Sequence, residues 1–399
     1  MIKSQFGWVD FSASDRSRVQ YALKQLSEPG TLDELGIGGL RDGFADLMFP
    51  GFSTIQTRAK YFITVPRILR DYLALSAVER RKLSPGAYLK EHETYVADAL
   101  KAAHPDGEQK GIIGVTMEDG QTVARLPSSV YWVGLRTWGL VNSHASLNQF
   151  LHTFTPQDEF SGSLSLDEPD DVDAGTIINR VNIDRYIPDW RKHLTITLTS
   201  SESDFLSNKL RTGPCYSLPR QFELCDLRAQ ALIHTDFPSL AAWIGRCKVL
   251  PAHTRETVKM AQAFSELIYG AHLRFNIVLA KKNKRNDLLE SLEEKWEAWR
   301  QQPQGVPNDI DMWIARTDVR LRHHTRVFLK KWCVEAPRKG SEDLLDLLVV
   351  RQADDNKKER SVLHKHLPES YQWVGIERLN YRWWQVRTIL TDIQEGQSC

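Results

Sequence analysis

Four cationic side chains and no acidic one lie between Thr54 and Arg70. The preceding stretch LRDGFADLMFPGF ends in a turn around Gly51, so the two parts together have the size of a helix-turn-helix. In this interpretation STIQTRAKYF is the recognition helix, whose polar side chains suit base edges and phosphates. The alternative is a pair of packed helices in which Arg58 pairs internally with Asp42 or Asp46. The predicted DNA contacts are Thr54, Gln56, Thr57, Arg58, Lys60 and, further along, Arg67.

A second candidate for nucleic-acid contact is the stretch RLPSSVYWVGLRTWGLV. Its arginines, Arg125 and Arg136, flank a predicted helix that carries Tyr131, Trp132 and Trp138. Arginines beside aromatic rings suit phosphate contact and base stacking. We therefore expect Arg125, Trp132 and Arg136 to contact nucleic acid. The alternative is that the three aromatic residues fill a core.

A third cationic stretch runs from Trp313 to Trp332, and within it Asp318 is the single acidic residue. If the stretch is one helix, cations recur along it at every fourth residue, and such a row repels itself by a few tenths of a kcal/mol per pair. A row kept despite this repulsion suggests a polyanion or an acidic partner surface. The acidic segment 155–175 of the same chain is an alternative partner. The cations are Arg316, Arg320, Arg322, Arg326, Lys330 and Lys331.

Signals for metal or cofactor binding are weak. The pairs His323-His324 and His364-x-His366 offer nitrogen ligands, but no third ligand stands at a diagnostic spacing. The chain has no Walker loop, no nucleophile elbow and no zinc-protease motif. The sequence therefore predicts no metal site and no cofactor.

One enzymatic alternative stays open, namely a metal-dependent nuclease built on dispersed carboxylates. Its candidates are Asp33, Glu34, Asp42 and Asp46, with Lys60 as a cation nearby. If these carboxylates point into one cleft, the nuclease is favoured. If they cap helices or pair with arginines, a binding protein is favoured.

The elements that must position these residues are mostly helical. Apolar spacing predicts helices at 12–26, at 40–47, from Ser53 or Thr54 towards Pro66, and again from Arg67 after a break near Val65. A helix begins at Ser128 or Ser129, and four more lie in the second half, at about 260–278, 288–299, 312–332 and 377–393. GIIGVTMEDGQTVARL, at 111–126, reads as two short strands about a turn. The predicted fold class is mainly α with a minor β component (α+β).

Residues 155–175 contain seven acidic residues and no basic one, a composition that cannot bury a core. We therefore predict an acidic linker there. It separates an N-terminal domain, 1–154, with helix-turn-helix-like units and the small β elements, from a helical C-terminal domain, 176–399.

Composition sets further limits on function. The chain has 399 residues and a net charge of +1, so nucleic-acid binding would depend on local patches. The five cysteines are scattered and form no C-x-x-C pair. The N-terminus lacks the apolar stretch of a signal peptide, and no window approaches the roughly 18 apolar residues of a spanning helix. We expect a soluble, cytoplasmic, reduced protein with no membrane contact.

Several blocks resemble an uncharacterised bacterial family, number 6361 in the series of domains of unknown function. The blocks are FGWVDFS, DELGIGGLRDGFADLMFPGFSTIQTRAKYFITVP, LPSSVYWVGLRTWGL, ELIYGAHLRFNIVLA and LNYRWWQVRTILTDI. The resemblance implies an association with gene neighbourhoods of phage defence, beside helicases or nucleases, and it supplies no catalytic residues. The resulting hypothesis is a non-catalytic DNA-binding or adaptor subunit of an anti-phage defence assembly. The alternatives are the nuclease and a scaffold that binds only protein.

Overall fold

The computed structural model describes residues 33–104, 111–115, 123, 125–154, 180–185, 187, 189–301, 309–336, 341–365, 367, 371–375 and 377–398. Within these residues every regular element is a helix, and the only β pairing is an isolated bridge between Val141 and Val181. The fold is therefore all-α, and the predicted minor β component was wrong. The first predicted strand is a series of turns at 111–115, where Gly111 and Gly114 have φ angles of 87° and 91°. Such angles favour glycine and are incompatible with extended pairing.

The chain divides into two compact units that are not consecutive in sequence. Unit 1 comprises residues 1–43 and 260–379, and unit 2 comprises residues 44–259 and 380–399. Two of the three boundaries between the units fall inside helices α2 (Gly38–Met48) and α13 (Ala252–Lys282), and the third lies between Leu379 and Asn380. The predicted linker, 155–175, lies outside the described residues, so the predicted pair of consecutive domains stays a prediction.

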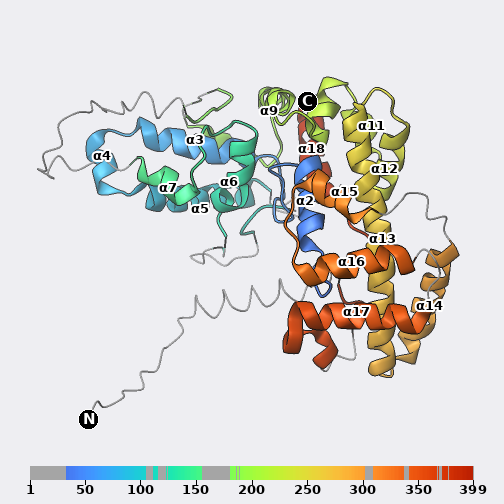
Figure 1. Cartoon of the computed structure of the whole chain (residues 1–399). Helices are drawn as coiled ribbons and strands as arrows, with labels where there is room; N and C mark the ends of the chain where they lie inside the picture. Colours follow the sequence, from blue (N-terminus) through green and yellow to red (C-terminus); the bar gives the residue numbers. More distant parts are fainter. Residues whose placement is uncertain are drawn as a thin grey trace, which may run out of the picture. The chain divides into compact units, whose positions relative to one another are not determined.

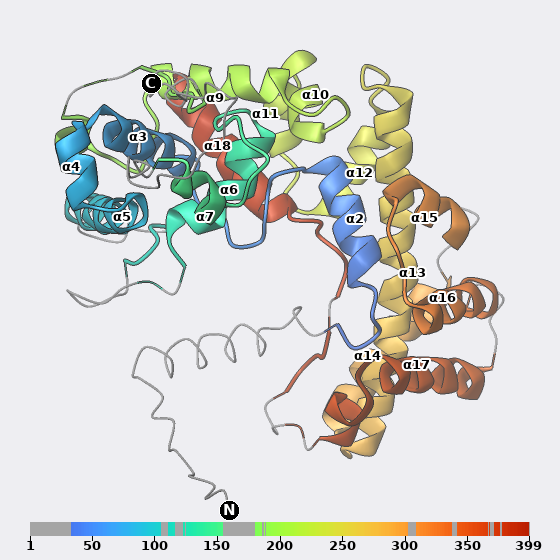
Figure 2. The same cartoon turned by 60° about the vertical axis from the view of Figure 1, so that its left-hand side comes forward.

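Unit 1 is organised around α13, the longest helix in Figures 1 and 2. Tryptophan side chains attach the neighbouring helices to it. The indole N–H groups of Trp299 and Trp332 donate to the backbone carbonyls of Glu266 and Leu267 at 2.8 and 3.0 Å, and Trp313 packs edge-on against Phe264. The helices around α13 are α14 (Asn286–Gln301), α15 (Ile310–Thr317), α16 (His323–Glu335) and α17 (Glu342–Lys357), followed by the short turns η2 (Lys358–Arg360) and η3 (Val362–His364).

The segment before α2 is held on α17 by side-chain amides. Gln352 donates to the carbonyl of Leu35 at 2.6 Å, and Asn356 donates to the carbonyls of Asp33 and Glu34. Gly36 has a φ of 70°, and a Cβ atom there would lie 2.8 Å from the Asn356 amide oxygen. A side chain at this position would therefore both strain the backbone and displace Asn356.

Unit 2 contains two groups of packed helices. In the first, α3 (Tyr61–Ala74) packs on α5 (Pro85–Ala103) and α6 (Pro127–Thr137). In the second, α9 (Ser200–Thr212) packs on α18 (Trp383–Ser398) and α10 (Leu218–Leu224). The remaining elements are α4 (Ala77–Lys82), α7 (Leu147–His152), η1 (Trp190–His193), α11 (Arg228–Leu232) and α12 (Phe237–Arg246). No helix among the described residues is long and apolar enough to cross a membrane.

Local patterns predicted several helices correctly. The stripe around Phe264 and Phe275 lies in α13 and both rings are fully buried, and the predictions at 40–47, 288–299 and 377–393 correspond to α2, α14 and α18. The predicted break near Val65 is wrong, because Pro66 lies inside a continuous α3. Residues 61–69 of α3 are all buried, so packing outweighs the lost hydrogen bond of the proline. The helix predicted at 12–26 lies outside the described residues.

Candidate nucleic-acid interface

The segment predicted as a recognition helix is a loop. Helix α2 ends at Met48 and α3 begins at Tyr61, so residues 49–60 separate them, whereas a helix-turn-helix has a turn of three or four residues. The backbone N–H groups of Thr57 and Arg58 donate to the Tyr131 hydroxyl at 2.8 and 3.0 Å. Side chains from distant helices therefore take the donors that a helix would use internally.

The polar residues of this loop hold the loop together. Gln56 is buried, and its amide donates to the carbonyl of Gly51 and accepts from the N–H of Ser53. The Thr57 hydroxyl donates to the carbonyl of Gly111 at 2.7 Å. Among the residues predicted to read bases, Thr54 is the exposed one.

Arg58 serves the structure through Asp392 of α18. Its guanidinium contacts both carboxylate oxygens at 2.9–3.0 Å, and the carboxylate also accepts the backbone N–H of Ala59 at 2.7 Å. Burial raises the pKa of Asp392, while Arg58 opposes that rise. Arg58 therefore has an internal acidic partner, as the alternative of packed helices predicted. That partner is Asp392 and not Asp42 or Asp46.

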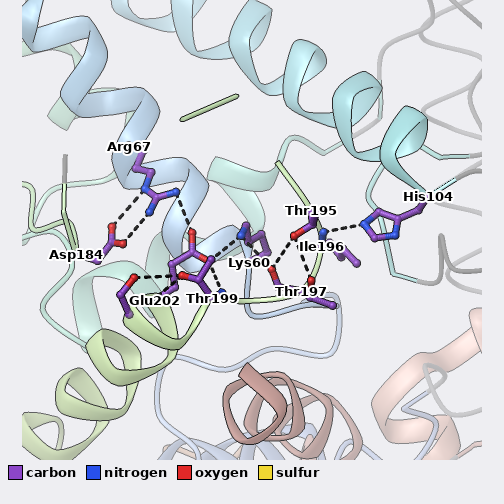
Figure 3. A network of polar contacts seen from close by, with 10 residues as sticks. Lys60, Arg67, His104, Asp184, Thr195, Ile196, Thr197, Thr199 and Glu202 are labelled. Carbon is purple, nitrogen blue, oxygen red and sulfur yellow. Dashed lines mark hydrogen bonds and ion pairs between the residues drawn. The ribbon is translucent and has the colours of Figure 1, made fainter. Parts of the chain in front are cut away.

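Lys60 and Arg67 lie in a buried ionic network (Figure 3). Glu202 joins them, with one carboxylate oxygen 2.7 Å from the Lys60 Nζ and the other 2.9 Å from an Arg67 nitrogen. Asp184 accepts a second bond from Arg67 at 2.7 Å. All four side chains are 6% exposed or less. Lys60 and Arg67 are therefore turned inward, and they are not presented to a phosphate.

The pKa shifts in this network follow from burial and pairing. Burial lowers the pKa of Lys60, and Glu202 only partly opposes this effect. Burial alone would raise the pKa of Glu202, but Lys60, the Thr199 backbone and Arg67 outweigh it and hold the pKa below its usual value. Glu202 is thus an ionised carboxylate that two buried cations share.

The same network fixes the segment that leads into α9. Lys60 donates to the carbonyl of Thr197 at 3.1 Å, and the Glu202 carboxylate accepts the N–H of Thr199 at 2.9 Å in a capping box. His104 accepts the N–H of Ile196 at 3.0 Å, also visible in Figure 3. These contacts join α3, α5 and α9 within unit 2.

The second candidate region also points largely inward. Trp132 is buried, and its indole N–H donates to the carbonyl of Ala145 at 3.0 Å. Arg136 is half-buried and donates to the carbonyls of His144 and Ala145 at 2.7 and 3.0 Å. Tyr131 and Trp138 are buried as well, so the aromatic residues fill a core as in the alternative. Arg125, which precedes α6, is exposed.

The third region keeps its cations at the surface, although it is two helices and not one. The helix ends before Asp318, whose φ is 52°, so that Arg316 lies in the last turn of α15 while Arg326 and Lys330 belong to α16. Arg316 is half-exposed and has an interaction within the chain. We call the remaining cations the basic surface, and all five are exposed: Arg320, Arg322, Arg326, Lys330 and Lys331.

One acidic side chain partly neutralises the basic surface. Asp311 of α15 lies 2.6 Å from Arg326 and 2.8 Å from Lys330, and these two cations hold its pKa below the usual value. All three side chains are about half exposed, at 47–51%. Exposed pairs of this kind are weak and open readily, so the cations stay available to a polyanion.

The carboxylates of the nuclease alternative have separate structural partners. Asp33 accepts the N–H groups of Ile37 and Gly38 at the start of α2, and Glu34 is buried against Ser361 and the N–H of Val362. Asp42 pairs with Arg41, and Asp46 pairs with Arg382. Asp33 therefore caps a helix, and Asp42 and Asp46 pair with arginines.

The histidines predicted as weak metal ligands are also dispersed. His364 pairs with Asp354 at 2.8 Å, His324 lies near Gln352, and His366 is outside the described residues. Among the residues that the structure describes, no group of three or more His, Cys, Asp or Glu side chains is arranged to hold a metal ion.

Sequence reasoning missed the residues that organise unit 2, chiefly Glu202, Asp392 and Glu93. Glu202 carried a readable signal, since Thr199 and Glu202 have the spacing of a capping box before a helix. Asp392 and Glu93 carried none, because their partners lie far away in sequence.

Comparison with known proteins identifies the family and nothing finer. No curated protein and no solved structure matches the chain. The model described as "Family of unknown function (DUF6361)" matches residues 3–395. Because the match covers nearly the whole sequence, this chain belongs to that family of unknown function.

Proposed function

We propose that this chain is a non-catalytic nucleic-acid-binding subunit whose contact surface is the basic surface of α16 and the loop before it. The observation that carries the proposal is the exposure of Arg320, Arg322, Arg326, Lys330 and Lys331, while Lys60 and Arg67 are buried. Duplex DNA is the polyanion that we propose, because clustered exposed cations bind its phosphates without a cofactor.

Three cations of this surface recur at every fourth residue. Arg326 and Lys330 therefore lie about 6 Å apart along one side of α16, and Arg322 is the N-cap residue at the start of that helix. Side chains of this length reach successive phosphates, each of which is worth about 0.9 in the slope of log K against log salt. The proposal concerns affinity and not sequence specificity, since contacts to phosphates carry no sequence information.

The biological setting that we propose is a bacterial anti-phage defence assembly. In that assembly the chain acts as a DNA-binding or adaptor subunit, beside a helicase or a nuclease that supplies the chemistry. This part is supported only by what the resemblance of the sequence blocks to the family implies. Purifying the chain together with the products of its neighbouring genes tests it directly, and elution of the chain alone would contradict it.

We expect the combined change Arg322→Ala, Arg326→Ala and Lys330→Ala to weaken duplex binding by about tenfold per lost phosphate contact near 0.1 M salt. The salt slope should fall by about 0.9 for each lost contact. Folding should be nearly unchanged, because the three side chains are exposed. Fluorescence anisotropy with a labelled duplex at several salt concentrations, together with a thermal melt, measures both effects.

A matched control removes three exposed cations from unit 2, by Arg81→Ala, Lys82→Ala and Lys90→Ala. This variant has the same net charge as the first and should bind duplex like the natural chain. Equal loss of affinity in both variants would show a non-specific charge effect. No measurable binding by the natural chain at low salt would favour the protein-binding scaffold.

A further inference from the structure

Unit 1 carries a second exposed charged helix, of sign opposite to α16. In α14 the residues Leu292, Trp296 and Trp299 face the interior. The opposite side presents Glu290, Glu293, Glu294 and Glu297, which together with Leu289 line a shallow hollow and are all exposed. We call Glu290, Glu294 and Glu297 the acidic ridge, and Arg322, Arg326 and Lys330 the basic ridge.

The two ridges match in spacing. Arg326 and Lys330 of the basic ridge lie four residues apart on α16, a rise of about 6 Å, and Arg322 is the N-cap residue just before that helix. Residues of the acidic ridge follow at intervals of four and three along α14, a rise of about 6 and 4.5 Å. Each ridge repels itself by a few tenths of a kcal/mol per pair. A contact between them relieves both repulsions and replaces them with attraction.

The residues that the structure describes do not fully neutralise either ridge. On α16 a single carboxylate, that of Asp311, serves both Arg326 and Lys330. On α14 Glu297 lies 4.0 Å from Arg300, and Glu290 and Glu294 form no ion pair with any residue that the structure describes. The excess charge on each helix is therefore available to an external surface.

Apolar side chains accompany the charges. Val327 and Val334 lie on the exposed side of α16, at 38% and 42% exposure. Leu289 lines the hollow of α14 beside the glutamates. A protein surface, unlike a phosphate backbone, offers apolar groups that such side chains contact. Desolvating them adds to the attraction between the ridges.

We propose that the basic ridge of α16 docks on the acidic ridge of α14 of a second copy of this chain. Every copy carries both complementary halves, and a net charge of +1 sets up little repulsion between copies. Around a twofold axis the contact is made twice and closes as a dimer, whereas a head-to-tail arrangement continues as a chain of copies. Both forms are weakened by salt, because the charges are exposed.

Two charge-reversed variants test this contact. The first, Arg326→Glu with Lys330→Glu, has two acidic helix faces. The second, Glu290→Lys with Glu294→Lys, has two basic ones. Each alone should remain monomeric, and an equimolar mixture should associate again because unlike faces are restored. Sedimentation velocity at about 50 mM and about 500 mM salt measures the association. At the lower salt concentration only, the natural protein and the mixture should show masses above the 45.8 kDa of one chain.

The control for charge alone is Arg81→Glu with Lys90→Glu in unit 2, which changes the net charge as the first variant does and should associate like the natural chain. If the first variant fails to fold, the second must still lose association while keeping its thermal melt. A natural chain that stays monomeric at all concentrations at low salt overturns the proposal, as does a mixture that fails to associate.

This inference does not depend on DNA binding, and the same variants separate the two proposals. The variant with Glu290→Lys and Glu294→Lys retains the whole basic surface, so it should bind duplex while losing self-association. Where both proposals hold, added duplex should dissociate the natural assembly, since the two ligands compete for one ridge. Binding without association refutes the contact between copies alone, and association without binding refutes the proposed function alone.

Discussion

Replacing Glu202 by alanine is expected to lower the free energy of unfolding by about 3–5 kcal/mol, because the change leaves two buried cations without their shared carboxylate. Lys60 is 4% exposed at its side chain and Arg67 is 6% exposed. Arg67 retains Asp184, but Lys60 is left with the carbonyl of Thr197 as its close polar partner. Urea unfolding monitored by circular dichroism measures the loss.

Two further variants separate the sources of this effect. Glu202→Gln keeps an acceptor for the N–H of Thr199, so it removes the charge while preserving the capping box. Lys60→Met combined with Glu202→Gln removes both members of the pair and should cost less than the sum of the single changes, by about 0.5–3 kcal/mol. Strict additivity of the two changes would show that the pair is not coupled.

The exposed pair between Lys192 and Asp189, at 2.7 Å, is the matched control. Both side chains are about two-thirds exposed, so Lys192→Ala should change stability little. A Glu202→Ala variant as stable as this control would contradict the structural role of the network and would return Lys60 to the list of possible ligand contacts.

Local periodicity predicted those helices whose stability comes from one continuous apolar face. The stripe of α13, with Phe264 and Phe275 among its members, repeats over so many turns that no other element fits it. The break between α15 and α16 was missed because nothing in the neighbouring sequence predicts the left-handed conformation that Asp318 adopts. Charged side chains on both sides continue the helical pattern through it.

The loop at 49–60 could not be predicted, because its conformation is set by residues far away in sequence. Its N–H donors are taken by Tyr131 and Asp392, which lie more than 70 and 330 positions further along. The same holds for Lys60, whose partner is Glu202. A row of cations in the sequence does not show whether its side chains are exposed. The buried cations Lys60 and Arg67 therefore could not be distinguished by sequence from the exposed cations Arg326 and Lys330.

Glu93 of α5 is expected to make stability fall as the pH rises. Its side chain is buried. One carboxyl oxygen accepts the backbone N–H of Ser128 in the first turn of α6, and the other lies 3.0 Å from the Ser128 hydroxyl. Burial raises the pKa of Glu93 from 4.5 to about 8, and the two bonds to Ser128 only partly oppose this. The folded carboxyl group is therefore protonated at neutral pH, while the unfolded one is ionised above its usual pKa.

At neutral pH, unfolding releases the proton that Glu93 holds in the fold. Between pH 4.5 and pH 8 the unfolded chain holds fewer protons at this residue than the folded chain, so the free energy of unfolding declines through that interval and levels off above it. Glu93→Gln removes the titration while its amide reproduces both contacts with Ser128. Relative to the natural chain, the variant should therefore gain about 3 kcal/mol between pH 4.5 and pH 7.

Urea unfolding of both proteins from pH 4.5 to pH 9 measures this difference directly, and comparison at each pH cancels the titration of all other groups. Glu93→Ala serves as a second variant, because it lacks the titrating group and also leaves Ser128 without its partner. It should show the same pH trend as Glu93→Gln at a lower overall stability. A Glu93→Gln variant whose stability relative to the natural chain stays constant between pH 4.5 and pH 7 would mean that the carboxylate is already ionised in the fold, with the N-terminus of α6 stabilising its charge more than burial opposes it.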